Sequence, residues 1–386
     1  MTMTDATGLR PRQDIPALTG ARGPAALAVV AYHLPMDQTV DTHQSWFGLE
    51  TLFARGHLGV DFFFILSGFI IHHVYRNVFA TGVSGHDARR FVLYRFARVW
   101  PLHIVTMLGA LALYAAAVLV FKRTPADVAS YSPVSLLANV GMVQSWFGFG
   151  SPNVPAWSIS AEWAAYLAFP FLCWALLRLP VLGWAGVALV ACLLTGTEFV
   201  THPLGRIACG FILGICLREA EGQFGLARHF GRWSGLVVVA ALAGSCWVLP
   251  ETTLIPYVAG FSLLILALSN PRDLLGRAAA RPWMVYLGEI SFALYMCHAV
   301  VWSAFKNIIR IALPGINPVS YVPVLAGTAL SLVTAAALYR WVEVPGRDLL
   351  RGGRKRPPQH RAPSVDERQA ALETPRNSTA ETQQTR

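Results

Sequence analysis

Arg22 and His33 lie eleven residues apart in one apolar stretch near the start of the chain. In a helix this offset returns to within about 20° of the same direction and rises by roughly 16 Å, so the two side chains share one face. Ionisable groups in hydrocarbon are costly without partners, so the pair indicates a functional site. An imidazole is suited to take a proton from a hydroxyl group. The alternative is that His33 only joins helices by hydrogen bonds.

Two carboxylates are expected at a similar depth. Asp61 follows the start of the second apolar stretch, and Glu162 lies in the first turns of the fourth. A carboxylate beside a catalytic imidazole orients the ring and stabilises its charged form. We therefore predict that His33, Asp61 and Glu162 form a catalytic group, and the sequence leaves open which carboxylate contacts the ring.

A basic segment precedes the third apolar stretch. Arg95 and Arg98 are three residues apart and project from one face of a helix, with Arg90 nearby. Guanidinium groups at this spacing suit phosphates. The alternative is that these arginines only fix the topology and meet lipid headgroups.

Composition sets the fold class. Of the 386 residues, 54% are hydrophobic and only 13% are charged, which is typical of an all-α polytopic membrane protein. About ten stretches are apolar enough to be transmembrane helices. They are residues 17–35, 57–75, 100–121, 157–178, 181–200, 203–219, 234–250, 253–269, 286–311 and 320–342. The connection 122–156 carries a further apolar segment, which we expect to be re-entrant or interfacial.

Charge sets the orientation. With both termini in the cytoplasm, fourteen arginines before the tail lie on the cytoplasmic side and only five basic residues lie opposite. Much of the net charge of +10 is thereby explained by topology, and no nucleic-acid partner is expected. The six cysteines show no metal-binding spacing, so we expect no metal. We predict a polar segment at 1–14, a membrane domain at 15–346 and a disordered cytoplasmic tail at 347–386.

Several motifs together resemble the membrane acyltransferase family 3, the bacterial O-acyltransferases of polysaccharides and some secreted small molecules. The resemblance covers nearly the whole membrane part. It is carried by Arg22 and His33, the segment 59–69, Arg95 and Arg98 before Trp100-Pro101, and the segments 157–163, 287–298 and 343–347. About forty residues follow the last apolar stretch, too few for the SGNH-type domain of some members, so the resemblance is to the stand-alone form.

The resemblance implies transfer of an acyl group, usually acetyl, from cytoplasmic acyl-CoA to a hydroxyl of an extracytoplasmic or lipid-linked glycan. It makes His33 the central catalytic residue, as a base or as the acyl carrier, and implies that Arg22, Arg90, Arg95 and Arg98 help to bind the donor. It places the chain, as a multi-pass protein among membrane lipids, in the bacterial cytoplasmic (inner) membrane. An alternative acceptor is a secreted small molecule such as a macrolide.

Other polar residues have weaker assignments. Ser67, Ser291, Tyr295 and His298 are candidates for the acceptor path, or else they join helices by hydrogen bonds. Arg206 is a candidate donor contact or a partner for Glu198. A proton-coupled transporter or flippase would use the same buried charges, although the sequence shows no clear internal repeat. A non-catalytic partner in polysaccharide assembly is a third possibility.

Overall fold

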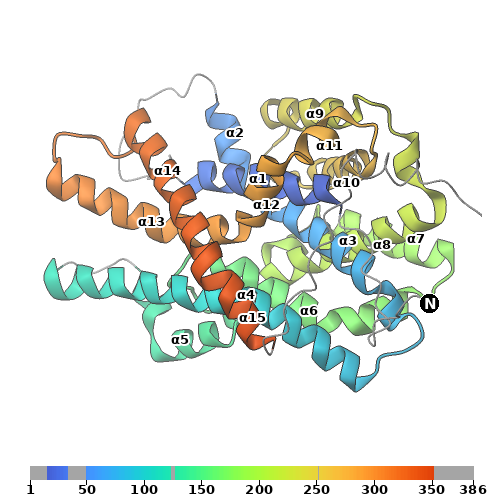
Figure 1. Cartoon of the computed structure of the whole chain (residues 1–386), viewed down its shortest axis with the longest axis horizontal. Coiled ribbons are helices and arrows are strands. Elements are labelled where there is room, and N and C mark those ends of the chain that lie inside the picture. Colours follow the sequence, from blue (N-terminus) through green and yellow to red (C-terminus); the bar gives the residue numbers. More distant parts are fainter. Residues whose placement is uncertain (1–14, 34–48, 123–126, 251, 352–386) are drawn as a thin grey trace, which may run out of the picture.

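The computed structural model describes residues 15–33, 49–122, 127–250 and 252–351, and in these residues it contains helices and no strands (Figure 1). The polar segment predicted at 1–14 lies outside the described residues. The α-helices are α1 (Pro16–His33), α2 (Glu50–Ala54), α3 (Gly59–Phe79), α4 (Gly85–Ala115), α5 (Pro133–Val140), α6 (Ala156–Leu176), α7 (Val181–Leu194), α8 (Pro203–Phe224), α9 (Ser234–Val248), α10 (Ile255–Ser269), α11 (Leu274–Ala279), α12 (Pro282–Glu289), α13 (Ser291–Ala312), α14 (Tyr321–Leu338) and α15 (Val344–Leu350).

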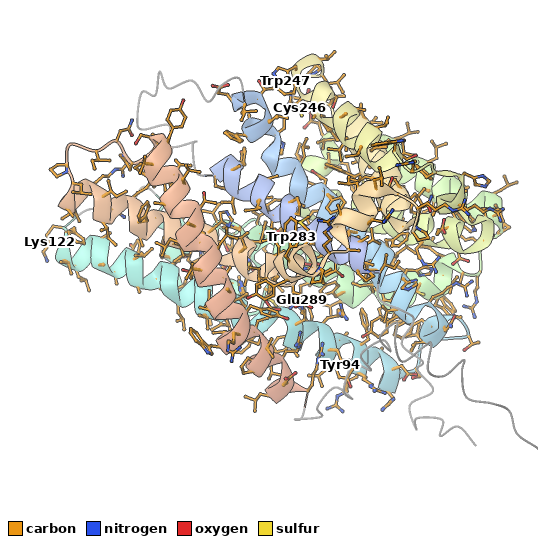
Figure 2. All side chains as sticks on the ribbon, turned by 45° about the horizontal axis from the view of Figure 1, so that its top comes forward. Tyr94, Lys122, Cys246, Trp247, Trp283 and Glu289 are labelled. Carbon is orange, nitrogen blue, oxygen red and sulfur yellow. The ribbon has the colours of Figure 1, made fainter. Side chains whose placement is uncertain are left out.

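Five of the described helical segments are long and apolar enough to cross a membrane. They are Glu50–Phe79, Gly85–Val120, Ala156–Leu176, Ser291–Ala312 and Tyr321–Leu350, and three shorter apolar helices are α7, α9 and α10. Large apolar side chains cover the outer surface of the bundle (Figure 2), among them Trp247, which is 54% exposed, and Trp283, which is 63% exposed. Such a surface is unfavourable in water and suits contact with lipid.

Helices occupy all ten predicted stretches, with two differences in their limits. The third begins at Gly85 rather than at residue 100, because the Ser84 side chain accepts a hydrogen bond from the Asp87 backbone N–H and caps the helix there. The ninth is divided at Ile290 into α12 and α13. The connection 122–156 contains α5, whose eight residues are too short to cross a membrane.

The chain also stays helical beyond the predicted end of the membrane domain. After a π-helical turn at Tyr339–Glu343, α15 runs to Leu350 and packs against α4. Pro345 is compatible with this helix because it occupies the first turn, where its missing N–H is not needed. Residues 347–350 are therefore helical rather than part of a disordered tail, and residues 352–386 lie outside the described part of the chain.

Helices α3 and α8 are held close together by glycines. A Cβ on Gly68 would collide with the backbone carbonyl of Phe211, and one on Gly214 would collide with that of Ile65. Small residues let membrane helices approach to backbone contact. Ser67, Asp61 and Arg206 are carried by these two helices, so their close packing helps to position polar groups of the interior.

Gly214→Val is expected to separate α3 from α8 and to lower stability by about 1–3 kcal/mol, the usual cost of overpacking a core. The measurement is the thermal unfolding midpoint of the purified protein in detergent. Gly244→Val in α9 is the matched control, because a Cβ there meets no atom within 4 Å. Equal midpoints for the two variants would contradict the packing argument.

Candidate active site

His33 and His298 meet inside the bundle. His33 is the last residue of α1, and His298 lies in α13 with 0% of its surface exposed. The Nδ1 atom of His33 is 3.3 Å from the Nε2 atom of His298, and the ring centroids are 4.9 Å apart. The side chain expected to be catalytic thus contacts a second imidazole.

Backbone carbonyls assign the protons of this pair. Nδ1 of His298 is 2.7 Å from the Tyr295 carbonyl oxygen, and Nδ1 of His33 is 2.9 Å from that of Val29. A carbonyl only accepts, so each Nδ1 carries a proton. Nε2 of His298 then accepts from Nδ1–H of His33. The remaining nitrogen of His33, Nε2, keeps its lone pair and can act as a base or a nucleophile.

Asp61 contacts a guanidinium rather than an imidazole. Its two oxygens accept hydrogen bonds of 2.8 Å and 2.6 Å from Arg206, which also lies over the Trp157 ring at 5.7 Å. Asp61, and not Glu198, is therefore the partner of Arg206. A bidentate pair of this kind gives a buried carboxylate two charge-assisted hydrogen bonds, and it links Asp61 in α3 to Arg206 in α8.

Glu162 is grouped with Arg22. Its carboxylate accepts hydrogen bonds from the Ser67 hydroxyl at 2.8 Å and from the Tyr166 hydroxyl at 2.5 Å. Glu162 and Arg22 line a cavity of about 60 Å³ together with Ser291 and Tyr295. Within the described residues, neither Asp61 nor Glu162 forms a hydrogen bond to His33, because each carboxylate has nearer donors.

The candidate residues of the acceptor path form hydrogen bonds within the bundle. The Ser291 hydroxyl donates to the Gly288 carbonyl at 2.7 Å. The Tyr295 hydroxyl lies 2.6 Å from the Ser158 hydroxyl and donates to the Pro155 carbonyl at 3.1 Å. Ser291 and Tyr295 therefore join neighbouring segments as well as lining the cavity.

Arginines and aromatic rings gather at the other end of this cavity. The Arg95 guanidinium donates to the Tyr75 hydroxyl at 3.4 Å and lies 5.9 Å from the centre of the Tyr166 ring. Arg98 forms an ion pair with Glu343 and lies 5.4 Å from the centre of the Phe292 ring, which lines the cavity.

The charges of Arg22, Arg95 and Arg347 all act on Arg98. These four cations lie in one neighbourhood and form the cationic cluster. Glu343 pairs with Arg98, Asp348 lies 3.7 Å from Arg347, and Glu162 acts on Arg22 and Arg95, so one positive charge remains in excess, which suits a phosphate group. Arg90 lies farther along α4 and donates to the Tyr94 hydroxyl at 3.3 Å. Sequence reasoning gave no site role to Arg347, although it closes the segment 343–347 that carried part of the resemblance.

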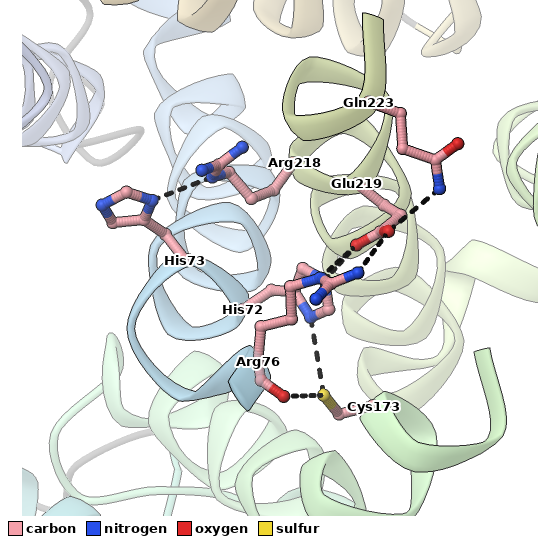
Figure 3. Close-up of polar contacts among 7 residues, drawn as sticks. All are labelled: His72, His73, Arg76, Cys173, Arg218, Glu219 and Gln223. Atoms are coloured by element: carbon pink, nitrogen blue, oxygen red, sulfur yellow. Dashed lines mark hydrogen bonds and ion pairs between the residues drawn. The ribbon is translucent and has the colours of Figure 1, made fainter. Parts of the chain in front are cut away.

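A second polar cluster was also missed (Figure 3). His72 is placed between the Cys173 thiol, 3.6 Å from Nδ1, and the Glu219 carboxylate, 3.1 Å from Nε2. Arg76 donates two hydrogen bonds to Glu219, at 2.8 Å and 2.9 Å, and Gln223 donates another. The order thiol, imidazole and carboxylate occurs in nucleophilic catalysis, but Cys173 and His72 are both 0% exposed. The cluster joins α3, α6 and α8.

In the part of the chain that the structure describes, no three His, Cys, Asp or Glu side chains are grouped so that they could hold a metal ion.

Comparisons with known proteins agree with one another. A domain model described as "Acyltransferase domain" matches residues 15–340. The acyltransferase MdmB of Streptomyces mycarofaciens is 31% identical over 384 residues, which are 89% of this chain and 94% of that protein. The peptidoglycan O-acetyltransferase OatA of Listeria monocytogenes is 24% identical over 377 residues, 87% of this chain and 56% of that protein. A putative O-acetyltransferase of Staphylococcus aureus is 23% identical over 86% of this chain and 57% of its own length. No solved structure matches the chain.

Proposed function

We propose that this chain moves an acyl group, acetyl in the first instance, from cytoplasmic acyl-CoA to a glycan hydroxyl across the membrane. The premise is that the chain belongs to the acyltransferase family whose domain model it matches. It is a membrane acyltransferase, and its relatives include O-acetyltransferases. The observation that carries the finer proposal is the His33–His298 pair, which leaves Nε2 of His33 with a free lone pair.

The orientation proposed has ten transmembrane helices and both termini in the cytoplasm of a bacterial inner membrane. The excess of arginine in the loops assigned to the cytoplasmic side supports it. In this orientation Arg95 and Arg98 lie toward the cytoplasm, and His33, at the far end of α1, lies toward the opposite side. A donor and an acceptor from opposite sides would then meet within the bundle.

The donor end is proposed at the cationic cluster. CoA carries several phosphates, which guanidinium groups bind well. Arg22, Arg95 and Arg98 supply the charge, and Arg90 is an outer contact. The small cavity between Arg22 and Tyr295 lies between this cluster and the histidine pair, and it marks the route proposed for the thioester end of the donor.

Two reaction routes use the same nitrogen of His33. In direct transfer, Nε2 removes the proton of the acceptor hydroxyl while the hydroxyl oxygen attacks the thioester carbonyl. The C–S bond breaks, and the proton passes from Nε2 to the CoA thiolate. In covalent transfer, Nε2 attacks the thioester carbonyl, the C–S bond breaks and CoA leaves as the thiolate, which gives a positively charged acyl-His33. The acceptor hydroxyl oxygen then attacks the acyl carbon, the N–C bond breaks, Nε2 regains its lone pair, and the hydroxyl proton passes to the CoA thiolate. A labelled protein isolated before acceptor is added distinguishes the second route from the first.

A saccharide acceptor is favoured by one relative. The Listeria protein is named for peptidoglycan, whose strands are polysaccharide, and this chain covers 56% of its length. The general test incubates purified protein with acetyl-CoA carrying a radiolabelled acetyl group and a panel of saccharide and small-molecule acceptors. Absence of both acceptor labelling and acetyl-CoA hydrolysis under all acceptors would contradict the proposed reaction.

His33→Ala is expected to abolish transfer, since it removes the only nitrogen assigned to the chemistry. Expression, the unfolding midpoint and donor binding should stay close to those of the unaltered protein. The measurement is label transferred per minute together with acetyl-CoA affinity. Turnover retained by His33→Ala would show that the reaction does not pass through this residue.

Arg95→Ala is expected to raise the apparent KM for acetyl-CoA, with a smaller effect on kcat, because Arg95 would bind a part of the donor remote from the reacting carbon. Loss of one charge-assisted contact corresponds to about tenfold or more. Arg178→Ala is the control, since Arg178 lies over Trp174 outside this cluster. An unchanged KM in Arg95→Ala would contradict donor binding by Arg95 and would favour the alternative that this arginine only fixes the topology.

His298→Leu is expected to lower kcat on the order of 10- to 100-fold, because Nδ1–H of His33 loses one of its two acceptors and the Val29 carbonyl alone then holds the ring in position. His298→Gln should recover much of the rate, since its amide oxygen can accept the same hydrogen bond. A structural role alone would lower the unfolding midpoint without changing the pH profile of kcat. Equal rates and profiles for the Leu and Gln variants would contradict the positioning role.

A further inference from the structure

A second cavity lies on the side of α1 away from the small cavity of Arg22 and Glu162. Its volume is about 380 Å³, within the range of ligand pockets. The wall is formed by α1, α9 and α10 with the turn Arg55–Leu58, and it is almost entirely apolar, with Ala25, Leu242 and Phe261 among the lining residues. An apolar cavity of this kind suits a hydrocarbon chain.

Arg55 is the charged residue of this wall. Its side chain is buried, with only 7% of the residue exposed. Nη2 donates to the Leu249 carbonyl at 2.7 Å, but Nε and Nη1 form no hydrogen bond in the described structure. No carboxylate of the described residues pairs with it. A buried guanidinium with two unsatisfied N–H groups is costly, and an anion bound there would remove that cost.

Arg55 lies near one end of an apolar helical segment, where lipid headgroups are expected. It lies near the beginning of the helical segment Glu50–Phe79, which is long and apolar enough to cross a membrane, rather than in its middle. The neighbouring helix α9 faces outward, with Val237 64% exposed and Val248 80% exposed. Lipid therefore surrounds the rim of the cavity, and a chain can enter from the side.

We propose that this cavity binds an anionic membrane phospholipid, with an acyl chain along the apolar wall and the phosphate on the Arg55 guanidinium, whose buried Nε and Nη1 become accessible when the side chain turns toward the cavity. Guanidinium groups bind phosphate through two parallel hydrogen bonds, and basic pockets between membrane helices take lipid headgroups. Free phosphate fits the guanidinium but leaves the apolar wall unused. This site is separate from the histidine pair, so it does not depend on the proposed reaction.

The test uses the full-length protein purified in detergent, incubated with mixed micelles of phosphatidylglycerol and phosphatidylcholine, washed, and analysed for bound lipid by mass spectrometry. The unaltered protein should retain about one phosphatidylglycerol per chain. Arg55→Gln should retain about tenfold less, as expected for loss of a charged hydrogen-bonding partner. Arg178→Gln, which changes an arginine beside Trp174, should retain the same amount as the unaltered protein.

A second variant addresses the cavity if Arg55→Gln does not fold. Ala243→Phe fills the wall from α9 and leaves Arg55 in place, and it should lower phosphatidylglycerol retention as well. Equal retention by the unaltered protein, Arg55→Gln and Ala243→Phe would overturn the proposal. Preferential retention of palmitate or of phosphatidylcholine over phosphatidylglycerol by the unaltered protein would overturn the assignment to an anionic phospholipid.

Discussion

The interior of this bundle depends on one constraint, that an ionised side chain among apolar helices needs an internal partner. Water cannot solvate these groups, and an unpaired charge costs several kcal/mol even after relaxation. The described structure meets the constraint with pairs that link distant segments, such as Asp61 with Arg206 and Glu219 with Arg76, and buried Arg55 is an exception. Each pair joins two helices, so α3 and α8 are connected at both ends of their glycine contact.

This pairing also decides the character of the candidate site. Asp61 and Glu162 accept hydrogen bonds from other donors, and the described partners of His33 are the Val29 carbonyl and the His298 imidazole. A carboxylate would favour the charged form of His33, whereas neutral His298 fixes the tautomer with less charge stabilisation. A neutral ring with its Nε2 lone pair available is the state needed by either proposed route.

Sequence reasoning located the helices and the polar residues on them, but not most of their contacts. Apolar stretches of sufficient length predicted the major helices of the described residues, and residue spacing correctly placed Arg95 and Arg98 on one helix. The link between Asp61 and Arg206 spans 145 residues, and that between His33 and His298 spans 265. Helical periodicity states which residues share a face, but not which face packs against which. The cluster of Cys173, His72 and Glu219 was missed for the same reason, because three separate helices form it.

The division of the ninth predicted helix at Ile290 adds a further source of positive potential to the site. Because α13 starts at Ser291, its N-terminus lies in the wall of the cavity that Arg22 and Glu162 also line. A helix N-terminus carries a partial positive charge, so it acts in the same sense as the arginines of the cationic cluster. The Glu162 carboxylate and its two hydroxyl donors offset part of this potential at the cavity wall. An unbroken helix from Pro282 to Ala312 would bury these backbone N–H groups in its own hydrogen bonds, so the break at Ile290 is what keeps the first N–H groups of α13 outside a longer helix.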